Sequence, residues 1–226
     1  MLALCLLAVS PAFAAEQQAD IPVLVQQAAQ PEVLFGSPSR LDSLLVRITA
    51  GGSESAKELL DLADTPWAWQ FEVIRRALER LGDISRREII TRLADSSLSD
   101  RKISVLLVLF EKLGQEGDES FLYGYLRAES RTVVVPALRC LAAFGAPDKT
   151  LKRLLPLLGS HDTYIRLAAV WATGELCRRR APENKEAGQL DSAVRPLLDD
   201  PVLQVRLTAA EVLHVLGTAP APELLR

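Results

Sequence analysis

The chain has 226 residues, 26 basic and 29 acidic, a formal charge of −3, and a hydrophobic content of 49%. This composition excludes a wholly disordered chain, and the length is sufficient to bury a core without disulfides or metals. The near balance of charge gives no broad cationic surface, so charge alone does not predict nucleic-acid binding. Only 5% of the residues are aromatic, and the abundance of leucine and alanine favours helices over sheets.

Residues 1–14, MLALCLLAVSPAFA, combine an apolar run with Pro11 and the small-residue ending Ala12-Phe13-Ala14. This pattern is typical of a secretory signal peptide, and we expect cleavage after Ala14. The run is shorter than the roughly 20 residues that cross a bilayer as a helix, so no permanent membrane span is expected. No Lys or Arg precedes it, which leaves open a longer signal or a buried helix. A periplasmic or secreted location follows from the signal-peptide interpretation.

An internal repeat organises the rest of the sequence. Amphipathic runs end at similar positions, 32, 31, 32 and 40 residues apart: Leu81-Gly82, Leu113-Gly114, Phe144-Gly145, Leu176-Cys177 and Leu216-Gly217. Apolar residues recur three, four, six and seven positions before the ends of the runs, with Arg75 an exception in the first run. This helical stripe predicts a packed face. A shorter helix and a polar turn precede each run, with N-cap side chains and with Pro66 and Pro201 expected in first helical turns.

This spacing predicts helical hairpins over residues 53–82, 85–114, 117–145, 148–177 and 184–217. The remaining segments are expected to be a linker over 15–38, a capping helix over 39–52 and a C-terminal tail over 218–226. The last repeat step is longer because residues 178–188 are inserted.

The last two hairpins resemble HEAT repeats. Leu154-Leu155-Pro156-Leu157-Leu158 precedes Asp162 and Ile165-Arg166, and Arg195-Pro196-Leu197-Leu198 precedes Asp200 and Val205-Arg206. In that family a proline bends the first helix, and an Asp with a Val-Arg pair opens the second. The short period is similar to the bacterial HEAT-like repeats that also occur in phycobilisome lyases. The first three units match by period only, with Phe71, Ile103 and Val134 in place of the arginine.

The resemblance implies an all-α protein, a right-handed α-α superhelix of the HEAT or armadillo type with about five helical hairpins over residues 53–217. In such a stack the second helices leave a continuous row of side chains pointing away from the core. We place this row two, five and nine residues before the end of each run. In the third to fifth units it includes the expected partner-binding residues: Val135, Arg139, Leu167, Trp171, Leu207 and Glu211.

Trp171 stands where other units carry Arg76, Val108, Arg139 and Glu211. With Val135, Leu167 and Leu207 it is expected to form an apolar patch rimmed by Arg139 and Glu211, as exposed interaction sites often are. The alternative is that the inserted segment covers Trp171. Trp67 and Trp69 flank the turn of the first hairpin, and core packing of at least one of them is favoured because such rings carry large buried areas.

The sequence presents no recognisable catalytic or metal-ligating pattern. His161 and His214 lie in different settings without a second histidine at helical spacing, so no metal or cofactor is expected. The basic residues of 71–102 are interleaved with acidic ones, which indicates a solvated, ion-paired face. Cys140 and Cys177 are expected to be about 12 Å apart, too far for a disulfide, so two thiols are predicted, with Cys140 buried.

These observations favour a non-catalytic HEAT-repeat scaffold that mediates protein–protein interactions in the bacterial cell envelope, with partners of unknown identity and no nucleic acid. The first alternative is an enzyme subunit or a lyase-like protein that binds a small ligand. A deep pocket with convergent polar groups would favour it, whereas a shallow apolar groove would favour partner binding. The second alternative, nucleic-acid binding, predicts an affinity that falls steeply with salt.

Overall fold

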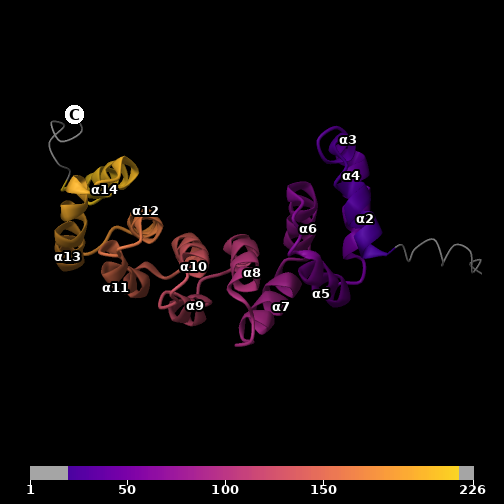
Figure 1. Cartoon of the computed structure of the whole chain (residues 1–226), viewed down its shortest axis with the longest axis horizontal. Coiled ribbons are helices and arrows are strands. Elements are labelled where there is room, and N and C mark those ends of the chain that lie inside the picture. The colour runs from indigo at the N-terminus through magenta and orange to yellow at the C-terminus, as the bar shows by residue number, and fades with distance from the viewer. Residues whose placement is uncertain (1–19, 219–226) are drawn as a thin grey trace, which may run out of the picture. The chain divides into compact units, whose positions relative to one another are not determined.

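A computed structural model describes residues 20–218 of the chain (Figure 1). Every regular element in this part is a helix, so the all-α prediction is confirmed there. The chain divides into two compact units at Arg92 and Leu93, here called the first unit (residues 20–92) and the second unit (residues 93–218). The expected signal peptide, residues 1–14, and most of the expected C-terminal tail lie outside the described residues.

The first unit is built from the helices that precede the first predicted hairpin, the hairpin itself and the helix that follows it. Its elements are α2 (Ile21–Ala28), α3 (Pro31–Leu34), α4 (Pro38–Thr49), α5 (Ser53–Leu62), α6 (Ala68–Leu81) and α7 (Asp83–Leu93). Helix α2 packs on α4, α5 and α6, and α4 packs on α6. Ile48, Leu59, Ile74 and Leu78 are fully buried in this core.

The prediction of a linker over 15–38 is wrong for residues 21–34, which form α2 and α3. Leu24, Val25, Val33 and Leu34 are buried there. The α2 segment reads IPVLVQQA, in which a proline at the start of the helix and closely spaced apolar residues support a short amphipathic helix. The expected capping helix over 39–52 is observed as α4, and Gly52 connects it to α5 with a positive φ of 57° that favours glycine.

The second unit contains the later repeats. Its elements are α8 (Asp100–Leu113), α9 (Glu119–Tyr125), α10 (Arg131–Phe144), α11 (Pro147–Leu158), α12 (Thr163–Arg179), α13 (Asn184–Val194), the 3₁₀ helix η1 (Arg195–Asp199) and α14 (Leu203–Val215). Helices α8, α10, α12 and α14 pack against one another in that order. Figure 1 shows α9, α11 and α13 along one side of this row. The second unit therefore has two layers of helices.

The later helices match the predicted hairpin ranges to within two residues: α9 and α10 lie in 117–145, α11 and α12 span 147–179 where 148–177 was expected, and α13 and α14 lie in 184–217. The expected hairpin over 85–114 is divided instead, because the boundary between the two units falls at the end of α7. The predicted packed face is confirmed at both ends of the repeat: Ala77 and Leu78 of α6 and Val212 and Leu213 of α14 are buried.

Helix starts and proline positions follow the sequence only in part. Ser99 and Asp162 cap α8 and α12 through their side chains, as the polar turns predict. Pro66 and Pro201 are not in first helical turns, because the N-caps of α6 and α14 are Trp67 and Val202, one residue later. Pro156 lies inside α11, whereas the equivalent proline, Pro196, lies in the 3₁₀ helix η1 that follows α13.

Candidate binding groove

An open groove of about 700 Å³ runs over the second unit, chiefly between α10 and α12. We call it the α10–α12 groove. Most of its lining comes from the N-terminal halves of these helices, with one contribution from α8 and two from α14. The lining residues are Ser104, Arg131, Thr132, Val135, Pro136, Arg139, Tyr164, Leu167, Ala168, Trp171, Gln204 and Thr208.

Most of these residues lie on the outer faces of their helices, because the opposite faces are buried in the core. On α10, Val133, Val134, Ala137 and Leu138 are nearly inaccessible to solvent. Val135 and Arg139 point away from them, as the helical period requires. Pro136 also belongs to the groove. Because proline has no N–H, it cannot donate the helical hydrogen bond to the carbonyl of residue 132, four positions earlier.

A chain of contacts crosses three helices at one end of the groove. Arg139 of α10 makes a two-point ion pair with Glu111 of α8, with Nε donating to Oε2 at 2.8 Å and Nη2 donating to Oε1 at 3.1 Å. The same guanidinium lies 5.8 Å from the centre of the Trp171 ring on α12, within the range of a cation–π interaction. The Glu111 carboxylate raises the pKa of Arg139 by accepting its hydrogen bonds. The indole is thereby held against a fixed positive charge.

A second arginine, Arg131, lies over an aromatic ring at the other end of the groove. The Arg131 guanidinium lies 4.5 Å from the centre of the Tyr164 ring, and its Nη1 is 3.9 Å from Oδ2 of Asp162. Arg131 and Tyr164 are both exposed. Two positive charges therefore line the groove with apolar and aromatic side chains between them, and no acidic side chain is part of its lining.

Of the six predicted partner-binding residues, four line the α10–α12 groove: Val135, Arg139, Leu167 and Trp171. Leu207 and Glu211 do not. Leu207 is 45% exposed, and Glu211 lies 3.9 Å from Arg178. Trp171 is half-buried, so the inserted segment does not cover it completely. Of the two charged residues expected at the rim, Arg139 lines the groove and pairs with Glu111, whereas Glu211 is not part of the lining.

Sequence reasoning missed the aromatic and polar residues at the N-terminal end of the groove. Thr132, Tyr164 and Gln204 occupy equivalent positions, twelve residues before the end of their runs. They extend the outward stripe by one more helical turn. Continuing the stripe beyond nine residues would have found them.

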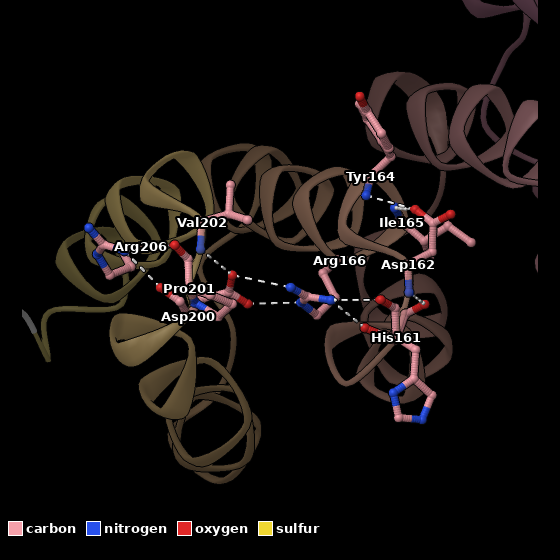
Figure 2. Close-up of polar contacts among 10 residues, drawn as sticks. His161, Asp162, Tyr164, Ile165, Arg166, Asp200, Pro201, Val202 and Arg206 are labelled. Atoms are coloured by element: carbon pink, nitrogen blue, oxygen red, sulfur yellow. Dashed lines mark hydrogen bonds and ion pairs between the residues drawn. The ribbon is translucent and has the colours of Figure 1, made fainter.

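A buried ion pair fixes the turn before α14 against α12 (Figure 2). Arg166 donates from Nε and Nη2 to the two carboxylate oxygens of Asp200, at 2.8 and 3.1 Å. Its Nη1 donates to the carbonyls of Ser160 and His161. In the next repeat, Arg206 contacts the backbone in the same way, with Nη1 donating to the carbonyls of Asp200 and Pro201. These arginines organise the turns rather than line the groove.

The predicted ion-paired face is confirmed for several arginines of residues 71–102. Arg75 and Arg76 pair with Glu72, and Arg80 pairs with Asp42. The arginines at the end of α12 are also engaged. Arg178 pairs with Glu175, and Arg180 pairs with Asp148. Arg179 donates to the backbone carbonyls of Ala142 and Gly145 at the end of α10.

The cysteine prediction is confirmed, since Cys140 and Cys177 are free thiols and both are buried. Burial raises the pKa of both groups, that of Cys177 to about 11. The prediction that at least one tryptophan of the first hairpin packs in the core is wrong: Trp67 is 66% and Trp69 is 49% exposed. Both line a second groove, in the first unit.

Within residues 20–218, no three His, Cys, Asp or Glu side chains gather as a metal site would require. No helix in the same range has the length and apolar character needed to cross a membrane. The fold and the groove define an all-helical protein whose second unit stacks helices in two layers and presents an open aromatic groove. Neither the known protein families nor the curated proteins compared with this chain show a match.

Proposed function

We propose that this chain is a non-catalytic HEAT-like repeat scaffold, a right-handed α-α superhelix, that binds protein partners in the bacterial cell envelope through the α10–α12 groove. The observation that carries the proposal is the groove itself, which joins repeat-related positions of consecutive helices into one open surface. Its shape supports partner binding over a small-ligand enzyme, since small-ligand sites enclose most of their ligand. The secretory pattern of residues 1–14 supports export to the periplasm or beyond.

The lining of the groove specifies the chemistry of the partner segment. Val135, Leu167 and Trp171 offer apolar contact, while Arg131 and Arg139 offer positive charge at two places. An occupant with an apolar or aromatic side chain between two carboxylates matches this pattern. Much of the groove is also preorganised, since Glu111 and Trp171 hold Arg139 in place before binding. Holding a side chain in its binding position reduces the entropy that association costs.

Site-specific photo-crosslinking in the native envelope tests this proposal. A photoreactive residue at Gln204, which lines the groove, is compared with one at His214, an exposed residue of the same helix outside it. We expect a discrete protein adduct from position 204 that is weakened by Trp171→Ala or Arg131→Glu and is absent from position 214. Equal adducts from both positions, or adducts that neither substitution changes, would remove the groove from the proposal.

Two further measurements separate the proposal from its alternatives. Mass spectrometry of the mature N-terminus is expected to find a chain that begins after Ala14, and an uncleaved chain in the cytoplasm would contradict export. An affinity for duplex DNA or RNA that falls steeply with salt would favour the nucleic-acid alternative.

A further inference from the structure

The groove in the first unit, which we call the tryptophan groove, has a different chemistry from the α10–α12 groove. It has a volume of about 390 Å³, near the lower end of the roughly 300–1,000 Å³ of small-ligand sites. Its lining contains no charged side chain and consists of Gln26, Ala29, Gln30, Pro31, Trp67, Ala68, Trp69 and Gln70. Two exposed indoles therefore stand beside three amides.

The backbone at the start of α6 brings both tryptophans to the same groove. Residues two apart within one helix point in nearly opposite directions. Trp67 is the N-cap of α6, with an extended backbone at φ −93° and ψ 109°, whereas Trp69 is in the first helical turn. This change of backbone direction lets the two side chains share one surface. Phe35, which follows α3, meets the Trp69 ring edge to face, with ring centres 6.1 Å apart and an interplanar angle of 82°, and so limits the orientation of that indole.

Hydrogen bonds position the polar groups beside the rings. The Thr65 hydroxyl donates to Oε1 of Gln70 at 2.9 Å and accepts from the backbone N–H of Trp67 at 3.2 Å. The Gln70 amide nitrogen is then oriented as a donor. Nε2 of Gln30 donates to the backbone carbonyl of Gln26 at 3.3 Å. This bond orients Oε1 of Gln30 as an acceptor. The groove thus offers both donors and acceptors next to two aromatic faces.

We propose that the tryptophan groove binds a neutral glycan built from pyranose rings with equatorial hydroxyls, of the β-1,4-linked glucose or N-acetylglucosamine type. Such a ring has an apolar face of C–H groups that stacks on an indole, and hydroxyls at its edge that both donate and accept hydrogen bonds. The uncharged lining suits a neutral ligand, because a charged one would lose hydration without gaining an ionic partner. A proline-rich peptide also fits aromatic grooves, but its backbone presents mainly acceptors and would leave the Gln30 oxygen unused.

Titration calorimetry of the full chain with chitopentaose and with cellopentaose tests the inference. We expect saturable binding of at least one of them with a dissociation constant below about 1 mM. Trp67→Ala and Trp69→Ala should each weaken it by about tenfold or more. Gln70→Ala should also weaken binding while leaving the tryptophans in place.

Two controls make the result decisive. Trp171→Ala, which removes an indole from the other unit, should leave glycan binding unchanged, so this test does not depend on the protein-binding proposal. Circular dichroism should show that the Trp67 and Trp69 variants remain folded, as their exposure predicts. The inference is overturned if neither glycan binds up to about 10 mM, if binding survives both tryptophan substitutions, or if a polyproline peptide binds in their place.

Discussion

Arg166 and Asp200 form a largely buried ion pair, with side chains only 12% and 5% exposed. The pair joins α12 to the turn that starts α14 through two hydrogen bonds of 2.8 and 3.1 Å. Asp200 also accepts from the backbone N–H of Val202 at 2.9 Å. The Asp200 carboxylate therefore links the side chain of Arg166 in one repeat to the backbone of Val202 in the next.

Removing this carboxylate should destabilise the second unit. In Asp200→Ala the Arg166 guanidinium stays buried without its partner, and we expect a loss of about 3 kcal/mol in the free energy of unfolding. Urea denaturation followed by circular dichroism measures it. Asp191→Ala, which removes the partner of the exposed Arg195, serves as the control and should cost much less. Similar losses in both variants would contradict the structural importance of the Arg166–Asp200 pair.

The same pair should make stability depend on pH. Arg166 holds the pKa of Asp200 below its ordinary value by hydrogen bonding to the carboxylate. A lowered folded-state pKa gives stability that is present above the unfolded value of about 3.9 and is lost as the pH falls through the folded value. The stability gap between the wild type and Asp200→Asn should therefore be constant near neutrality and shrink below about pH 4. Urea midpoints across this range check it, and a gap independent of pH would refute the assignment.

The tryptophans should differ in their accessibility to a quencher. Trp171 is half-buried under Arg139, whereas Trp67 and Trp69 are exposed. Acrylamide should quench the Trp171→Phe chain, which keeps the first two, more steeply than the Trp67→Phe/Trp69→Phe chain, which keeps Trp171. Adding Arg139→Ala to the latter should increase its quenching, because the guanidinium no longer covers the ring. The opposite order of slopes would show that Trp171 is the more accessible indole.

Close packing of α12 on α14 depends on Gly174. A Cβ atom at this position would lie 3.0 Å from Cγ2 of Val212, closer than side chains normally approach. Gly174→Val should therefore lower the free energy of unfolding by about 1–3 kcal/mol through overpacking. Adding Val212→Ala should recover part of that loss, and a double-mutant cycle measures the coupling. Additive effects would indicate that the two positions do not meet.

The two described thiols should be unreactive in the folded protein. Burial raises the pKa of Cys177 to about 11, so at neutral pH this thiol carries almost no reactive thiolate. Cys140 is more deeply buried and donates to the carbonyl of Leu107. In the chain that begins after Ala14, Ellman's reagent should modify neither thiol rapidly under native conditions and both in guanidinium. Fast native labelling would show that the second unit opens readily.

The sequence by itself determined most of the helical segments and the packed faces at both ends of the repeat. The near-regular spacing of apolar runs is a local property, since each helix buries the stripe that its own residues define. This spacing correctly predicted that Ala77, Leu78, Val212 and Leu213 face the core. Four of the six residues expected at the site line the α10–α12 groove.

Only the tertiary structure decided which outward side chains meet. Arg139 pairs with Glu111, 28 positions earlier, so its partner depends on how α8 and α10 pack rather than on the spacing within one helix. The exposure of Trp67 and Trp69 depends likewise on α2 and α3, which form where the sequence predicted a linker. The helical periodicity around a residue gives the direction in which its side chain points, but the burial of that side chain depends on which other segments pack against it.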